Sequence, residues 1–241
     1  MMADQLSPVP SLKFQWPSIT VVIVTYRRAD EVRAVIRGLQ ERIRYHGQLS
    51  YHLADGGSPN GYIRDIMADF PHLSVSHTVC TRGMGANVNT ALAAIPVGYT
   101  YLNVDDMVPC RTLDFNAGVA LLESVPQIGA VRYDGIEGHR GLVLSLEELD
   151  YPPLYYMRIR RRLSIHQNCY SGRPHLRHPR FTAFYGPYNE GYPLGPTELA
   201  YAMRFKGSPW GPSIAVLSSG IEHAFQHIGV SWQGTKHDVH V

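Results

Sequence analysis

The segment Tyr101–Pro109 (YLNVDDMVP) joins the end of an apolar run to two adjacent carboxylates and a proline. Neighbouring side chains of a strand point to opposite faces, so Asp105 and Asp106 can serve one site only if the strand ends and turns there. Pro109 supports that end, because proline cannot continue a β-ladder. Two interpretations stay open on this segment alone: a solvated turn that caps a helix, or a site whose carboxylate oxygens bind Mg²⁺ or Mn²⁺.

Strand and helix patterns alternate upstream of this segment. The β-branched run Ile19–Thr25 (ITVVIVT) is typical of a buried strand, and we expect a helix over 31–45 with Asp30 as its N-cap. The next expected elements are a strand over 51–55, a helix over 62–70, a strand over 73–79, a helix over 86–95 and a strand over 99–104. Alternation at this spacing predicts an α/β fold, with a mostly parallel, Rossmann-like central sheet flanked by helices in a single domain.

The second half of the chain carries weaker patterns. A helix over 112–124 and a strand over 128–133 are expected, and a segment over 151–196 that is rich in Pro, Gly, Tyr and His is expected to be mostly loop. A helix over 198–206 follows, with Thr197 as its expected N-cap and Glu198 at the positive end of its dipole, before a last strand over 214–217. Residues 1–18 carry prolines and no periodicity, which predicts an N-terminal tail.

Composition sets the protein class. The 241 residues are 44% hydrophobic and 17% charged, which fits a globular protein and argues against disorder. A net charge of +2 is too small to argue for nucleic acid. Three dispersed cysteines predict no disulfide framework, and we find neither a transmembrane run nor a signal peptide. We therefore expect a cytoplasmic protein, with peripheral membrane association left open.

Several motifs, taken in order, resemble nucleotide-sugar glycosyltransferases of the GT-A fold, nearest to the inverting family 2. The resemblance covers about 19–231, although 136–190 fits poorly. Its carriers are VVIVTYRR at 21–28, Asp55, RGMGANVN at 82–89, NVDD at 103–106, Thr197-Glu198 and HIGVS at 227–231. The resemblance implies a GT-A-like domain over 19–241, with a nucleotide-sugar-binding half (19–115) and an acceptor-binding half (116–241). It also implies metal-dependent transfer, with inversion, of a sugar from a UDP- or GDP-sugar to a hydroxyl of a glycan or glycoconjugate.

The resemblance also implies site residues. Those expected to bind the donor are Thr25, Tyr26, Arg28, Asp55, Arg82, Gly83, Asn87, Asn103 and Asp105. The expected ligands of Mn²⁺ or Mg²⁺ are Asp105, Asp106 and His227, with His223 as the alternative to His227. The chain departs from the family's DxD signature, because Asn103 stands where the first aspartate belongs.

One carboxylate is enough to take a proton from the acceptor hydroxyl. Glu198 occupies the position of the family's catalytic aspartate, and Glu190 is the runner-up. Tyr188, Asn189 and Glu190 are candidates for acceptor binding. The arginine run over 158–162 is either a solvated face or a grip on a diphosphate or an anionic acceptor.

Three alternatives stay open. A nucleotidyltransferase of similar fold needs a glycine-rich loop after the first strand, and YRRAD at 26–30 contains no glycine. A degenerate, non-catalytic nucleotide- or sugar-binding module is supported by Asn103. A nucleic-acid-modifying glycosyltransferase rests only on the arginine run and the small positive charge.

Overall fold

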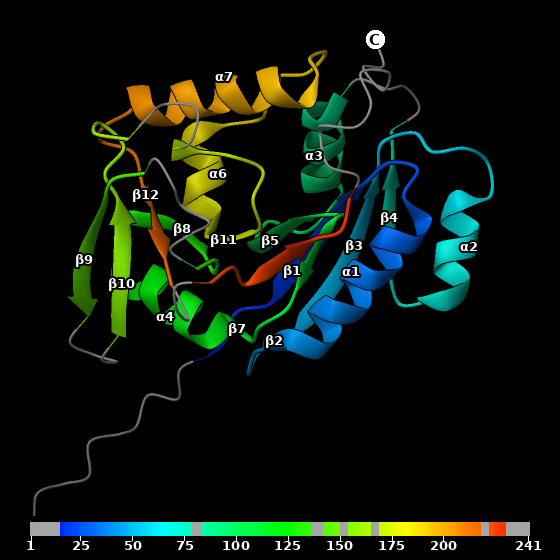
Figure 1. Ribbon diagram of the computed structural model, residues 1–241, viewed down its shortest axis with the longest axis horizontal. Coiled ribbons are helices and arrows are strands. Elements are labelled where there is room, and N and C mark those ends of the chain that lie inside the picture. The colour runs from blue at the N-terminus through cyan, green and yellow to red at the C-terminus, as the bar shows by residue number, and fades with distance from the viewer. Residues whose placement is uncertain are drawn as a thin grey trace, which may run out of the picture.

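The computed structural model describes residues 15–78, 83–135, 142–149, 154–164, 169–217 and 222–229. Its helices and strands follow the expected α/β order through the first half of the chain (Figure 1). In chain order they are β1 (Ile19–Thr25), α1 (Ala29–Arg42), β2 (Ile43–Arg44), β3 (Leu49–Asp55), α2 (Tyr62–Asp69), β4 (Ser74–His77), α3 (Gly83–Ala94), β5 (Tyr99–Val104), β6 (Met107–Pro109), β7 (Leu113–Asp114), α4 (Phe115–Ser124), β8 (Ile128–Arg132), β9 (Leu144–Leu149), β10 (Leu154–Ile159), β11 (His175–Arg177), α6 (Pro179–Tyr185), α7 (Leu194–Gly207), β12 (Ser213–Val216) and β13 (Phe225–His227).

A nine-stranded sheet in the order β4-β3-β1-β5-β11-β8-β12-β10-β9 forms the centre. Strand β1 pairs in parallel with β3 and β5, and β12 pairs in parallel with β8. Strand β11 is inserted antiparallel between β5 and β8, and β10 is antiparallel to both of its neighbours. The predicted mostly parallel sheet is therefore confirmed. Because β11 is antiparallel to both β5 and β8, those two strands run in the same direction, and their carboxyl ends lie at the same edge.

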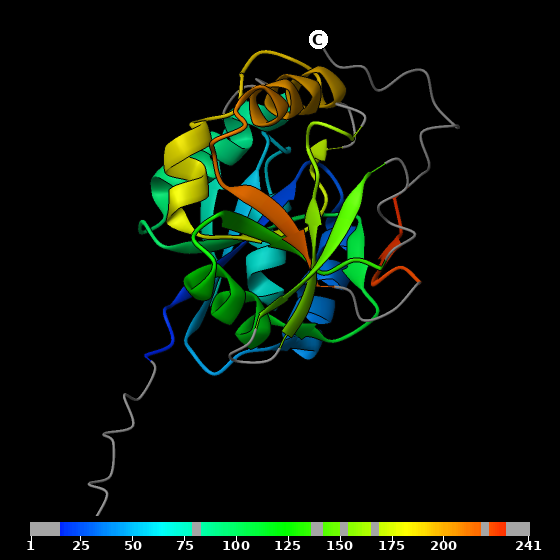
Figure 2. The same ribbon diagram turned by 90° about the vertical axis from the view of Figure 1, so that its left-hand side faces the viewer.

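Two apolar cores cover the two faces of the sheet (Figures 1 and 2). Side chains alternate along β1, so Val21 and Ile23 pack with α1 and α4, whereas Val22 and Val24 pack on the other face with α3 and α7. Burial on both faces explains why the run Ile19–Thr25 is apolar without alternation. Among the described residues, no helix combines the length and apolarity needed to cross a bilayer.

Four expected helix starts are wrong. Helix α3 begins at Gly83, three residues before the expected start at Ala86. Helix α1 begins before Asp30, with Arg28 at the cap position and no side-chain cap bond. Helix α7 begins at Leu194, so Thr197 and Glu198 lie inside it, because Pro196 fits the first turn of a helix and does not block it. Helix α4 begins at Phe115, after the cap Asp114, whose carboxylate accepts from the Asn116 and Ala117 amides at 3.0 and 3.2 Å.

The segment over 151–196 combines loops with regular elements in its described part. It contributes β10 and β11 to the central sheet and forms α6 and the start of α7. Strand β11 is only three residues long and is buried on both sides, and such a short element leaves almost no periodicity in the sequence.

Candidate active site

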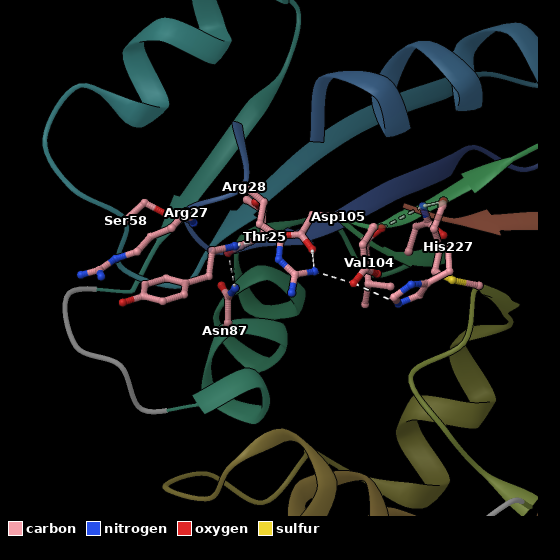
Figure 3. A network of polar contacts seen from close by, with 12 residues as sticks. Thr25, Arg27, Arg28, Ser58, Asn87, Val104, Asp105 and His227 are labelled. Carbon is pink, nitrogen blue, oxygen red and sulfur yellow. Dashed lines mark hydrogen bonds and ion pairs between the residues drawn. The ribbon is translucent and has the colours of Figure 1, made fainter. Parts of the chain in front are cut away.

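The carboxyl ends of β1, β3 and β5 lie next to one another and form the floor of the site. Thr25 is in register with Asp55, and Val24 with Val104. The Asp105 amide donates to the Val24 carbonyl at 3.0 Å, and Asn87 of α3 donates from its side chain to the Ala54 carbonyl at 2.9 Å. Asn87 also lies 3.5 Å from the Thr25 carbonyl (Figure 3). These polar residues therefore lie together at one edge of the sheet.

The turn after β1 brings Arg28 to the acidic pair. Arg27 has a φ of 58°, a left-handed conformation that costs a side-chain-bearing residue about 1 kcal/mol, and its amide donates to the Ser58 hydroxyl at 2.9 Å. The Tyr26 amide donates to Asp105 Oδ2 at 3.1 Å. Arg28 Nη1 lies 3.3 Å from Asp105 Oδ1 and also donates to Asp106 Oδ2 (Figure 3). One guanidinium nitrogen therefore bridges both carboxylates.

His227 reaches the same pair through strand pairing. Strand β13 is antiparallel to β6 with His227 opposite Met107, and the Ile228 amide donates to the Asp106 carbonyl at 2.9 Å. His227 Nε2 lies 3.3 Å from Asp106 Oδ2. A Cβ added at Gly229 would lie only 2.7 Å from that oxygen, so the close approach of this backbone requires glycine.

The side chains at this edge carry atoms of the chemical types that coordinate a divalent cation. Two carboxylates and an imidazole suit Mn²⁺, and Arg28 already holds a positive charge between the carboxylates. Within the described ranges, however, no three His, Cys, Asp or Glu side chains form a ready metal cluster. Burial raises the pKa of Asp105 to about 6. The charge of Arg28 and the hydrogen bond from the Tyr26 amide act in the opposite direction and lower this pKa.

Asn103 and Asp55, both expected to bind the donor, are engaged in contacts within the protein. Asn103 is buried and its amide donates to the Met107 carbonyl at 3.0 Å, so it closes the acidic turn. Asp55 is also fully buried; its carboxylate accepts from the Ser58 amide at 3.0 Å and contacts His77 Nδ1 at 2.7 Å. The exposed group at that strand end is His77, which ends β4 and which the sequence analysis missed.

Glycines let α3 pack closely against the segment that leads into α7. A Cβ at Gly83 would overlap the Tyr192 carbonyl oxygen, and one at Gly85 would overlap that of Asn189. The role of Gly83 shown by the structure is therefore close packing. Arg82, expected beside the donor, lies outside the described residues, as do the last two residues of the HIGVS motif.

The three residues expected to bind the acceptor differ in their exposure to solvent. Tyr188 is buried and its hydroxyl accepts from the buried Arg177, so it is a packing residue, which corrects that expectation. Asn189 accepts from Arg204 at 2.7 Å. The Glu190 carboxylate accepts from the Asn89 side chain at 2.9 Å and is exposed.

Glu198 lies in a different setting from Glu190. Its carboxylate accepts from the Gly172 amide, and burial raises its pKa, while that hydrogen bond, Arg132 and Arg173 oppose the shift. Arg132 at the end of β8 is fully buried, and its Nε and Nη2 have no hydrogen-bond partner in the described part of the chain. Burial lowers the pKa of Arg132 to about 10. Glu198 is therefore a shielded carboxylate beside two cationic side chains.

Asp134 follows β8 and binds Arg173, one of the two cationic side chains named for Glu198. It accepts from Arg173 at 2.6 Å and from the Ala224 amide at 2.9 Å, and His223 Nδ1 lies 3.5 Å from it. His223 thus faces Asp134 and not the Asp105–Asp106 pair, which corrects its expected role as an alternative ligand. The strand predicted over 128–133 ends immediately before Asp134. A carboxylate at a strand end was therefore the sequence signal that could have identified Asp134 as a site residue.

Comparison with known proteins supports the fold. No protein-family model matches this sequence, and no curated protein matches it. Among solved structures, the Pyrobaculum calidifontis mannosyltransferase PcManGT, in complex with GDP-Man and Mn²⁺, is 15% identical with a TM-score of 0.60, covering 92% of this chain and 59% of its own. S. aureus TarS is 13% identical with a TM-score of 0.62, covering 86% of this chain and 36% of its own.

A third solved structure is the Mycobacterium tuberculosis glucosyl-3-phosphoglycerate synthase, in complex with Mn²⁺, UDP and phosphoglyceric acid. It is 15% identical with a TM-score of 0.59, covering 89% of this chain and 72% of its own. The chain spans 59% of the mannosyltransferase and 36% of TarS. At these identities the likeness concerns architecture, and the chain has the GT-A fold of nucleotide-sugar glycosyltransferases.

Proposed function

We propose that this protein is a metal-dependent glycosyltransferase that moves a sugar from a nucleoside-diphosphate sugar, UDP- or GDP-linked, to an acceptor hydroxyl. The observation that carries the proposal is the Asp105–Asp106 pair at the carboxyl end of β5, with Arg28 between the carboxylates and His227 beside Asp106. Ligands of open α/β sheets bind outside the carboxyl ends of the strands, where these residues lie.

Charge supports a diphosphate donor together with a cation. Two carboxylates and a diphosphate would place about four negative charges in one site, and Arg28 neutralises one of them. Asp105, Asp106 and His227 would hold Mn²⁺, which would neutralise charge that develops on the leaving diphosphate. Arg28 would then turn from the carboxylates toward the phosphates, since an arginine fork matches phosphate oxygens. We place the nucleoside beside the Tyr26–Arg28 turn and His77.

Glu198 is the proposed general base. Glu198 is half-buried, and a carboxylate with a raised pKa is a better proton acceptor than one with an ordinary pKa. Arg132 and Arg173 would keep it ionised before reaction. A single base that acts on an attacking hydroxyl fits a direct displacement, so we propose inversion at the sugar carbon.

The first experiment is a thermal-shift screen of UDP, GDP and their sugar conjugates, with Mn²⁺ and with EDTA. The right donor should raise Tm by mass action, and more in Mn²⁺ than in EDTA. If none of these nucleotides raised Tm, the proposed donor site would be contradicted.

The second experiment compares Glu198→Gln with Glu190→Gln, using sugar transfer or slow donor hydrolysis as the assay. Glu198→Gln should keep donor-induced stabilisation and lose about 100- to 10,000-fold in turnover, the usual contribution of a general base. Glu190→Gln, at the alternative base, should lose less turnover than Glu198→Gln. Glu41→Gln, at a side chain of α1 that is 68% exposed, is the matched control and should stay within a few-fold of wild type. Full turnover in Glu198→Gln would remove the base assignment. Donor stabilisation without turnover in the wild type would favour the non-catalytic binding module.

A further inference from the structure

A second concave site lies away from the acidic pair. It is a groove of about 810 Å³ between the segment over 158–163, which ends β10, and the segment over 209–213, which follows α7 and leads into β12. Pro126 and Gln127, which precede β8, also line it. The groove therefore adjoins the amino ends of β8 and β12, whereas the acidic pair follows the carboxyl end of β5. We call it the arginine groove.

The charge of the arginine groove has one sign. Among the described residues, five arginines line it (Arg158, Arg160, Arg161, Arg162 and Arg180), and no Asp or Glu does. Of these arginines, Arg158 pairs with a carboxylate, Glu147, at 2.8 Å. Arg160 and Arg162 are exposed, and neither side chain has an ion pair or hydrogen bond within the described part of the chain.

Two further arginines donate hydrogen bonds to neutral groups, and neither forms an ion pair within the described part of the chain. Arg161 is buried and donates to the Tyr185 hydroxyl at 2.8 Å and to the Ser208 and Gly211 carbonyls at 2.5 Å each. Arg180 donates to backbone carbonyls at the end of α4 and at the start of β8. These bonds hold the walls of the groove rigidly and leave a positive field in its opening.

Large apolar side chains stand beside these cations. Trp210 is 92% exposed, Leu163 is 70% exposed and Phe184 is 51% exposed, and all three line the groove. Figure 1 shows the region of the fold concerned, where the end of β10 approaches the end of α7. An exposed apolar cluster marks an interaction surface. Tryptophan beside arginine is the pairing used at the headgroup level of a bilayer, where the indole lies among headgroups and the cation pairs with lipid phosphate.

We propose that the arginine groove docks the protein on a membrane surface that carries anionic phospholipids. Arg160 and Arg162 pair with lipid phosphates, and Trp210 and Leu163 enter the headgroup region. The aliphatic Leu163 favours a bilayer over single-stranded nucleic acid, whose bases stack on aromatic side chains. This inference goes beyond the proposed function and does not depend on it, because none of these residues belongs to the candidate active site.

The test is co-sedimentation of the full chain with vesicles of phosphatidylcholine alone or mixed with phosphatidylglycerol, at low and high salt. Wild type should bind the mixed vesicles, and more weakly at high salt. The double variant Arg160→Glu/Arg162→Glu should bind at least about 30-fold more weakly, given the contribution of each basic residue near an anionic surface. Arg42→Glu/Arg64→Glu, which changes the same charge on α1 and α2, should bind like wild type.

Tryptophan emission locates the contact. Emission should shift to the blue with mixed vesicles, and Trp210→Phe should remove most of that shift while the other two tryptophans remain. Equal binding to neutral vesicles, equal losses in the two double variants, or binding of single-stranded RNA without binding of vesicles would each overturn the proposal. Donor-induced stabilisation and turnover should be unchanged in Arg160→Glu/Arg162→Glu, so failure here is separable from failure of the proposed function.

Discussion

Replacing Arg28 by methionine tests whether the guanidinium occupies a cation site. Arg28 Nη1 lies 3.3 Å from Asp105 Oδ1 and contacts Asp106 as well. One such pair is worth about 5 kcal/mol at an effective dielectric constant of about 20. Desolvation of the guanidinium opposes this attraction, and the Arg28 side chain is 39% exposed, so water screens it. We therefore expect Arg28→Met to lower the free energy of unfolding by about 2 kcal/mol.

That loss should appear as a fall in Tm of about 4–8 °C for a domain of this size. Mn²⁺ should then stabilise Arg28→Met more than wild type, because the ion no longer competes with the guanidinium for Asp105 and Asp106. The measurement is Tm against Mn²⁺ concentration for both proteins. Arg64→Met is the control: its side chain is 83% exposed and pairs with the exposed Asp65, so Tm and the Mn²⁺ response should hardly change.

Two results would refute this reasoning. If Arg28→Met and Arg64→Met lost the same stability, Arg28 would make no more than a surface contact. If Mn²⁺ stabilised wild type and Arg28→Met equally, the ion would bind elsewhere, and the acidic pair would not be a metal site.

Three other predictions concern the framework around the sites. Gly118→Ala should lower stability by about 2 kcal/mol, because the new Cβ overlaps the buried Tyr133 hydroxyl, and the double variant with Tyr133→Phe should recover most of the loss in urea unfolding. His175 is buried, donates from Nδ1 to a backbone carbonyl at 2.6 Å and accepts from an arginine at Nε2, so burial keeps its pKa well below 6.5. On acidification, the unfolded chain therefore binds a proton at His175 before the folded protein does, and Tm should fall as pH drops below 6.5. The fall in Tm per pH unit should be smaller in His175→Gln. Arg161→Met should lose about 3 kcal/mol in urea unfolding by leaving buried carbonyls unpaired, whereas Arg160→Met should lose almost nothing.

Local chemistry explains the part of the fold that was predictable. Burial on both sheet faces makes a parallel strand continuously apolar, as in Ile19–Thr25. The helical spacing of Val32, Val35 and Ile36 likewise matches the buried face of α1. Acidic residues placed directly after apolar runs located the carboxyl edge of the sheet. Helix starts were less certain, since Asp30 and Thr197 fit a cap position by residue type, and only the backbone path decides whether they occupy it.

The sequence by itself determined the β-α order and the position of Asp105-Asp106 at the end of β5, because periodicity and turn chemistry act between near neighbours in the chain. Only the tertiary structure decided which side chains meet there. It placed Arg28 and His227 on that pair, turned Asn103 and Asp55 inward, and separated the exposed Arg160 and Arg162 from the buried Arg161 of the same run. The physical reason is that these contacts join segments tens of residues apart, and their geometry follows from strand order and side-chain direction across the completed sheet.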